Sequence, residues 1–265
     1  MADQGAHGIA WTETTWNPIR GCSRVSEGCR HCYAEAIAHR FSGPGQPYEG
    51  LTTADGKWNG VVRVVEDHMN DPLTWRRPRL VFVNSMSDLF HESLPDTAID
   101  CVFHVMEHAP QHQFQVLTKR VHRMRPYHQR KGVVLPNVWM GVSVEDTGSW
   151  NERVSSLRDT PAAIRWVSVE PQLANICPRE SDLVGIDWLV IGGESGPDAR
   201  PFDTRWARQW IELGRATGTA IFIKQLGSHA AYALGMKSRK GGDMDEWPQD
   251  LRVREYPVIK EPHHA

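Results

Sequence analysis

The sequence predicts an α/β protein: a partial or complete (β/α) barrel with parallel strands and outer helices. Two observations favour this class. From residue 79 onward, short apolar runs alternate with segments typical of a loop followed by a helix. Polar or charged residues gather directly after these runs, which is where β/α folds build their sites. For this second reason we prefer a barrel to a doubly wound open sheet.

The predicted strands are short runs, rich in β-branched and aromatic residues, that are nearly apolar on both faces. Such strands are typical of a parallel sheet covered by helices. They are Leu80–Val83, Phe114–Leu117, Val138–Val144, Ile164–Val169, Trp188–Ile191 and Ala220–Ile223.

Two of the intervening helices show clear apolar spacing. The first stripe, between the first two runs, comprises Ile99, Val102, Phe103, Val105 and Met106. The second, before the last run, comprises Trp206, Trp210, Ile211 and Leu213. Cys101 is assigned to the first stripe, and we expect it to be a small core residue.

Composition excludes several classes of protein. With 40% hydrophobic and 23% charged residues among 265, the chain can bury a core and is too polar for a fibre or a membrane protein. It contains no run near the ~20 apolar residues of a spanning helix, and its start lacks a signal-peptide layout. We expect a cytoplasmic protein. The formal charge of −2 gives no global attraction to nucleic acid, so such binding needs a local patch.

We expect a single β/α domain over residues 1–265 with two irregular parts. Residues 42–60 are rich in Gly, Pro and Thr, which indicates an irregular insertion near the mouth of the barrel. Residues 241–265 contain Trp-Pro and Tyr-Pro pairs and are predicted to form an extended tail.

Polar groups follow the predicted strands where each strand stops. Because the carboxyl ends of parallel strands meet at one edge, these groups can form a shared site. The alternative is that each ties one strand end to its neighbour by an ion pair or hydrogen bond. The strand ends are residues 84–88 (NSMSD), 118–120 (TKR), 143–145 (SVE), 168–170 (SVE), 192–195 (GGES) and 224–225 (KQ).

Residues 21–35 are the most informative segment, because Cys22, Cys29 and Cys32 fall within eleven residues. In a cytosolic protein such a cluster more often binds metal than forms disulfides. Residues 34–41 show helical spacing, so Cys32 is expected at the start of a helix. There the helix dipole and free N–H groups lower a thiolate pKa and stabilise a metal-bound thiolate. Three thiolates suit an iron–sulfur cluster with one open iron, or zinc with a histidine or Cys177 as fourth ligand. His31 is adjacent in sequence, but a residue between Cys29 and Cys32 usually cannot turn onto their shared metal without distorting the loop.

The motif CxxCY, opening a helix, resembles the radical S-adenosylmethionine (SAM) superfamily. Several segments together are more similar to a phage-associated family with a three-cysteine motif, found in phages and bacteria, whose activity is not established. These segments are TWNPIRGC, GCRHCYAE, VFVNSMSDLFHE, FQVLTKR, GVSVE, IGGESGPDARP and IKQLG. The resemblance extends from about Trp11 to Pro257 and implies a radical-SAM-like barrel.

The resemblance implies that Cys22, Cys29 and Cys32 bind three irons of a [4Fe-4S] cluster, whose fourth iron takes the amino and carboxylate groups of SAM. One electron would then cleave SAM to a 5′-deoxyadenosyl radical that abstracts hydrogen from a substrate. An electron donor protein is implied as a partner. The protein's own part is orientation and exclusion of water.

Other roles also follow from the resemblance. Tyr33 would lie against the adenine. Ser143, Glu145 and Glu170 are candidates for ribose and methionine contacts, and Lys119 or Lys224 for a carboxylate or phosphate. We expect Lys119, Glu170 and Lys224 to be the catalytic candidates.

The sequence departs from the superfamily at two points. Six residues separate Cys22 from Cys29, where the superfamily usually has three. The Gly-Gly-Glu motif follows a late strand, at Gly192, Gly193 and Glu194, instead of the second strand. We therefore expect these three residues to face the cofactor or substrate from the opposite wall. The contact to the SAM amino group is expected in part from Ser85, Ser87 or Asp88.

One local feature concerns the substrate. Residues 119–131 carry six Lys or Arg, two His and a Tyr without an acid, and residues 75–79 add a second basic and aromatic group. Such groups suit a phosphate backbone and stacked bases, although a charge run is also typical of a solvated face. The predicted contacts are Lys119, Arg120, Arg123, Arg125, Arg130 and Lys131.

Three functions are consistent with these patterns. The first is a radical SAM enzyme that acts on a nucleic acid base or nucleotide, in modification or lesion repair. The alternative is a non-catalytic, zinc-stabilised β/α protein that binds nucleic acid or a partner. The third is a zinc hydrolase with Glu145, Glu170 or Glu194 as general base, which is disfavoured because three thiolates make zinc a poor Lewis acid.

Overall fold

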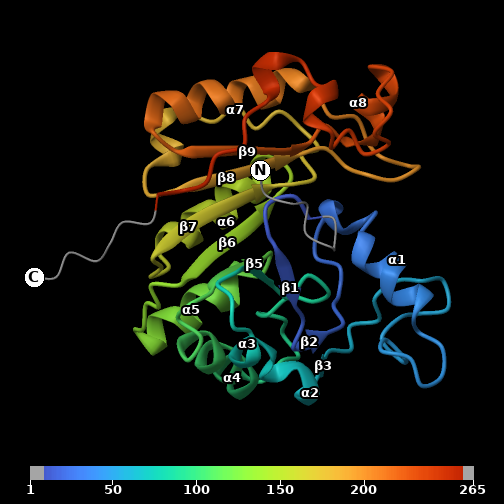
Figure 1. Cartoon of the computed structure of the whole chain (residues 1–265), viewed down its shortest axis with the longest axis vertical. Coiled ribbons are helices and arrows are strands. Elements are labelled where there is room, and N and C mark those ends of the chain that lie inside the picture. The colour runs from blue at the N-terminus through green and yellow to red at the C-terminus, as the bar shows by residue number, and fades with distance from the viewer. Residues whose placement is uncertain (1–8, 259–265) are drawn as a thin grey trace, which may run out of the picture. The chain divides into compact units, whose positions relative to one another are not determined.

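The computed structural model describes residues 9–258, and Figure 1 shows its elements. The chain divides into two compact units, each described here by itself. Unit 1 contains the chain up to Met140 together with Thr160–Ala163, and unit 2 contains Gly141–Asp159 and the chain from Ile164 onward. Among the described helices, none has the length and apolar character needed to cross a membrane.

Unit 1 is built on parallel strands. β1 (Thr14–Trp16), β4 (Leu80–Val83) and β5 (Gln113–Thr118) pair in that order, followed by the first residues of β6 (Val138–Val144). A short antiparallel ribbon joins β2 (Ile19–Arg20) to β3 (Arg63–Val64).

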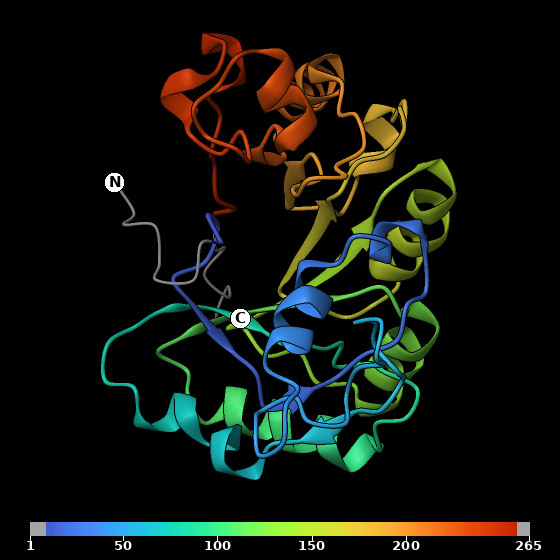
Figure 2. The same cartoon turned by 90° about the vertical axis from the view of Figure 1, so that its right-hand side faces the viewer.

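The helices of unit 1 follow its strands. They are α1 (Tyr33–Arg40), α2 (Glu66–Met69), α3 (Asp71–Thr74), α4 (Asp96–Glu107) and α5 (Val121–Lys131). Helices α2, α3 and α4 contact one another and lie together in both views (Figures 1 and 2).

Unit 2 repeats the same arrangement. The rest of β6 is followed by β7 (Ile164–Val169), β8 (Trp188–Gly192) and β9 (Ala220–Gln225), with β7, β8 and β9 paired in parallel. Its helices are α6 (Thr147–Arg158), α7 (Thr204–Thr217) and α8 (Gly227–Ala233).

The predicted α/β class, with parallel strands and intervening helices, is confirmed. All six predicted strands are present, three of them one or two residues longer than the apolar run. Every residue of β6 and β8 is buried, as strands covered on both faces require. Strand β1 escaped prediction because it has only three residues, two of them Thr. Both helices predicted from apolar stripes are present, as α4 and α7.

Cys101 and the tail differ from their predicted form, whereas residues 42–60 are irregular as expected. Cys101 is exposed on α4 and not in the core, because its position falls beside the buried stripe. Residues 42–60 contain turns and the bridge between Thr52 and Trp58, without a helix or strand. The tail is not simply extended, since it forms 3₁₀ turns at Met244–Glu246 and Gln249–Leu251. Residues 259–265 of this predicted tail lie outside the described residues.

Candidate metal centre

The three cysteines of unit 1 come from one loop and the helix that follows it. Cys22 lies two residues after β2, Cys29 ends a 3₁₀ turn that begins at Glu27, and Cys32 is the residue that caps the start of α1. The predicted position of Cys32 at a helix start is thus confirmed.

Gly21 fixes where this loop leaves the ribbon. Its φ of +94° is a conformation that favours glycine, and an added Cβ would lie 2.1 Å from the carbonyl oxygen of Val61. The backbone N–H of Gly21 donates to the carbonyl of Met86 at 3.2 Å, and Gly21 forms a parallel bridge with Ser87. The cysteine loop is therefore attached to the segment that follows β4.

The three thiols are free, half-buried and electrostatically coupled. Cys22 and Cys32 pack against a small apolar cluster that includes Leu51, Trp58 and Met86. Burial raises the pKa of Cys22 to about 12, Arg120 opposes this rise, and negative charge on Cys32 or Cys29 adds to it. Each thiol therefore lies within electrostatic range of the others.

The helix start lowers the Cys32 pKa less than the sequence led us to expect. The backbone N–H groups of Glu35 and Ala34 do favour the thiolate. Burial has the larger effect, however, so that the pKa of Cys32 is raised overall.

Arg120 is the buried cation of this centre. Its Nη1 donates to the Cys22 sulfur at 3.7 Å and to Asp88 at 3.0 Å, and its Nε donates to both carboxylate oxygens of Glu92 at 2.9 and 3.0 Å. Its Nη2 donates to the carbonyl and hydroxyl oxygens of Ser23 at 3.1 and 2.8 Å. Burial alone would lower the pKa of Arg120, but Asp88, the Cys22 thiolate and Glu92 raise it, so the guanidinium stays charged.

Asp88 connects this cation to the ends of two strands. Its carboxylate accepts from the Thr118 hydroxyl at 2.7 Å, from the Lys119 backbone at 3.1 Å and from the Phe90 backbone at 3.0 Å, besides Arg120. With these donors, the buried carboxylate serves to position Arg120. The sequence singled out Asp88 for a different contact, to the SAM amino group.

Sequence reasoning missed His91, whose ring contacts the same Ser23 hydroxyl that accepts from Arg120. Its Nδ1 accepts from the Ser93 backbone at 3.2 Å and its Nε2 lies 2.9 Å from the Ser23 hydroxyl. Burial and, next, the charge of Arg120 lower the pKa of His91. The residues His91 and Glu92 belong to the segment SDLFHE, which was the only signal available in the sequence.

A second ion pair, also missed, holds the cysteine loop against α1. Arg24 donates to both carboxylate oxygens of Glu35, at distances of 2.5 to 3.1 Å, and Glu35 also accepts from the Trp58 backbone at 3.1 Å. Glu35 is buried on α1, whereas Arg24 is about one-third exposed. The bidentate pair therefore fixes the loop between Cys22 and Cys29 to the helix that Cys32 starts.

The end of β4 carries buried polar atoms without a partner. Asn84 has a φ of +65° and is 2% exposed, and neither its amide nitrogen nor its amide oxygen has a hydrogen-bond partner. The hydroxyl of Ser87 is in the same condition. Ser85 instead donates to Asn17 at 3.2 Å, and the hydroxyl of Tyr33 donates to the Ser85 carbonyl at 3.1 Å. Tyr33 is half-exposed.

Unit 2 brings together four of the other predicted site residues. Lys224 of β9 forms an ion pair with Glu170 at 2.6 Å, and the Ser143 hydroxyl donates to the Glu170 carbonyl at 3.2 Å. Gly192 lies against the Glu170 side chain, where an added Cβ would come within 3.2 Å of Oε1. The ends of β6, β7, β8 and β9 therefore meet at Glu170.

The remaining predicted residues of unit 2 have close partners of their own. Glu145 pairs with buried Arg153 at 2.9 Å, and Glu194 pairs with Arg200 at 2.6 Å. Gly193 packs so closely against the residue that follows β9 that an added Cβ would lie 2.4 Å from the Leu226 carbonyl oxygen.

Comparison with known proteins identifies the family. Residues 6–250 match the model of a family described as protein of unknown function (DUF5131). The chain belongs to this family. Searches of curated proteins and of solved structures gave no match. The family description assigns no chemistry, so the residues themselves carry the functional argument.

In this DUF5131 protein, acidic residues pair with much of the predicted basic patch. Arg123 and Arg130 of α5 both pair with Asp96 of α4 at 2.7 Å, and Lys131 pairs with Asp100 at 2.8 Å. Arg120 is buried beside Cys22. The spacing of acids on α4 thus compensates charges that appear unopposed in the sequence of residues 119–131.

The three loop sulfurs do not form a compact single-ion site. Among residues 9–258, the group of three metal-ligating residues whose ligand atoms all lie within 4.8 Å of one another is His104, Glu107 and His108, on α4. A single zinc ion holds its thiolate ligands around one centre, whereas a cluster offers each thiolate a different iron. The sulfurs of Cys22, Cys29 and Cys32 thus do not all lie within 4.8 Å of one another.

Proposed function

We propose that this protein is a radical SAM enzyme that holds a [4Fe-4S] cluster through Cys22, Cys29 and Cys32. One observation carries the proposal: three free, half-buried thiols lie on one loop and at the helix start that follows it, and Cys22 and Cys32 pack against the same apolar cluster. Thiolates are the ligands that iron–sulfur clusters take. When bound, the cluster supplies the electron for reductive cleavage of SAM.

The surrounding residues support this site. The ion pair between Arg24 and Glu35 fixes the loop against α1, and the Asp88 carboxylate holds Arg120 against Cys22. Hydrogen bonds to cluster sulfurs raise the reduction potential of a cluster. Arg120 is therefore a positioning residue that orients the Cys22 thiolate and stabilises negative charge on it.

Asn84 and Ser87 are the residues we propose for the cofactor amino or carboxylate group. Buried polar atoms in proteins nearly always have hydrogen-bond partners, so the unpartnered side-chain atoms of Asn84 and Ser87 are free to bond the polar groups of a ligand. Asn84 offers both a donor and an acceptor, and Ser87 adds a hydroxyl. This refines the expectation that Ser85, Ser87 or Asp88 makes the contact, because Asp88 and Ser85 already have partners.

For the substrate, we retain the class expected from the sequence, with fewer basic residues available to contact it. A nucleic acid base or nucleotide is still the substrate class that the basic and aromatic segments favour. The ion pairs of Arg123, Arg130 and Lys131 reduce the charge available to a phosphate backbone. Nucleic acid binding therefore needs its own test, by titration of a labelled oligonucleotide. An electron donor protein, and a cytoplasm that keeps the thiols reduced, complete the proposal.

The metal content tests the proposal directly. The protein is purified without oxygen, reconstituted with iron and sulfide, and assayed for iron, sulfide and the electron paramagnetic resonance signal of the reduced cluster. We expect about four irons and four sulfides per chain, loss of the signal in Cys32→Ala, and its retention in Cys101→Ser, which changes an exposed cysteine outside the loop. Tightly bound zinc in place of iron in the wild type would overturn the proposal and favour the zinc-stabilised alternative.

A further inference from the structure

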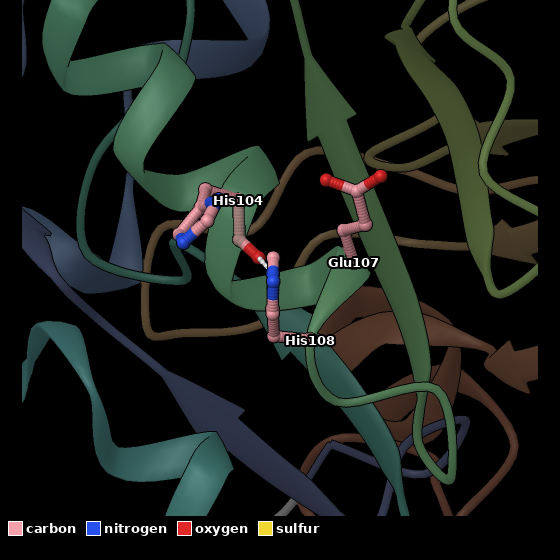
Figure 3. A group of neighbouring side chains, drawn as sticks. All are labelled: His104, Glu107 and His108. Atoms are coloured by element: carbon pink, nitrogen blue, oxygen red, sulfur yellow. Dashed lines mark hydrogen bonds between the residues drawn. The ribbon is translucent and has the colours of Figure 1, made fainter.

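A separate group of metal-ligating side chains lies at the end of α4, in unit 1. His104, Glu107 and His108 are spaced so that a helix presents them on one face. One ligand atom of each lies within 4.8 Å of those of the other two, and all three side chains are exposed (Figure 3). We propose that these residues bind a divalent transition-metal ion, independently of the cysteine loop.

A hydrogen bond to the backbone fixes the tautomer of His108. Its Nδ1 lies 2.8 Å from the backbone carbonyl oxygen of His104, the contact drawn as a dashed line in Figure 3. A carbonyl oxygen only accepts, so Nδ1 carries the proton and the lone pair is left on Nε2. Histidines that bind metals commonly donate their other ring N–H to a carbonyl in this way, which fixes both the tautomer and the ring orientation.

The position of the group on the helix favours a cation. His104 and Glu107 lie in the last turn of α4, and His108 is the residue that ends it. The C-terminal end of a helix carries partial negative charge, to which the Glu107 carboxylate adds a full one. The imidazole rings of His104 and His108 are already adjacent, with centroids 4.0 Å apart.

The ligand types select the class of ion. Two imidazoles and one carboxylate suit Zn²⁺, Ni²⁺, Co²⁺ or Cu²⁺, whereas Ca²⁺ and Mg²⁺ prefer oxygen ligands alone. Three ligands from one exposed helix face leave further coordination positions open to water or to a group from another molecule.

The test is a calorimetric titration of the full chain, stripped of metal, with Ni²⁺ and in parallel with Zn²⁺. The variants are His104→Gln, His108→Gln and Glu107→Gln. The control is the double variant His263→Gln/His264→Gln, because the sequence carries a second histidine pair there. All these variants retain the three loop cysteines, so metal bound by the loop contributes equally to every titration.

We expect the wild type and the control to share one site, in addition to any metal bound by the loop. The affinity of this site should fall by about tenfold or more in His104→Gln and in His108→Gln, since loss of a metal-binding contact has effects of this size. Glu107→Gln should weaken the same site severalfold. The proposal is overturned if His104→Gln and His108→Gln bind with wild-type stoichiometry and affinity, or if the wild type shows no site that these variants lack.

Discussion

The guanidinium of Arg120 donates to the sulfur of Cys22 at 3.7 Å, and the carboxylate of Asp88 holds that guanidinium in place at 3.0 Å. This contact links the end of β5 to the cysteine loop, ninety-eight residues apart in sequence. A buried cation at a thiol stabilises the thiolate, which is the form that binds metal. Arg120 thus opposes the rise in the Cys22 pKa that burial causes, although burial has the larger effect.

The buried ion pair predicts a large effect of Arg120→Met. The substitution leaves Asp88 charged and buried without its cation, which typically destabilises a protein by about 3–5 kcal/mol. Urea unfolding of the protein measures the free energy of unfolding. As a control, Arg205→Met removes a solvent-exposed ion pair to Asp203 and should change the free energy of unfolding far less than Arg120→Met does. Equal effects of the two substitutions would contradict the structural role of Arg120.

The side-chain amide of Asn84 has no hydrogen-bond partner, so its removal should weaken SAM binding while leaving the stability of the protein nearly unchanged. Asn84→Gly keeps the φ of +65° accessible and removes the amide, so the free energy of unfolding should change by no more than about 1 kcal/mol. Affinity for SAM should fall about tenfold or more, because hydrogen bonds to charged groups contribute about 1.5–3 kcal/mol. Calorimetry on the reconstituted protein measures the affinity, and unchanged affinity would rule out the assigned contact.

The close packing around Gly193 predicts that an added methyl group there destabilises the protein. Gly193→Ala would place a Cβ 2.4 Å from the Leu226 carbonyl oxygen, so the residues that directly follow β8 and β9 must move apart. Overpacking of this kind costs about 1–3 kcal/mol. Gly242→Ala is the matched control, because an added Cβ there meets no atom within 4 Å. Thermal unfolding of both variants compares the two sites.

Buried His128 predicts a loss of stability in acid. Burial lowers its pKa to about 4, from an ordinary value of 6.5, because its ring lies between aromatic side chains of α4 and α5. Between these two values the unfolded chain binds the proton and the folded chain does not, so stability falls as the pH falls from 6.5 towards 4. The shift corresponds to at most about 3 kcal/mol.

The variant His128→Leu isolates this contribution. Urea unfolding at several pH values should show a smaller loss between pH 6.5 and 4.5 than in the wild type. His91 and His112, whose pKa values are also lowered by burial, titrate in both proteins and therefore do not affect the difference. An identical pH dependence in the two proteins would show that His128 is not buried as described.

The sequence was sufficient for the six strands β4 to β9 and for the position of Cys32, because both depend on local patterns of apolar residues, whereas the two- and three-residue strands β1, β2 and β3 are too short to show such a pattern. It was insufficient for Arg120, which looked like one more cation in a basic run. Only the pairing of β4 with β5 brings Asp88 beside it, and that contact is invisible to local spacing. Arg123 and Arg130 were interpreted as phosphate contacts for the same reason, since the Asp96 that pairs with them lies on a different helix.

The most direct test of the central claim is the cleavage of SAM. The anaerobically reconstituted protein is incubated with a reductant and SAM, and 5′-deoxyadenosine is measured by mass spectrometry. We predict product from the wild type and from Cys101→Ser, and none from Cys32→Ala. No product from a wild-type protein that carries its full complement of iron and sulfide would contradict the proposed function.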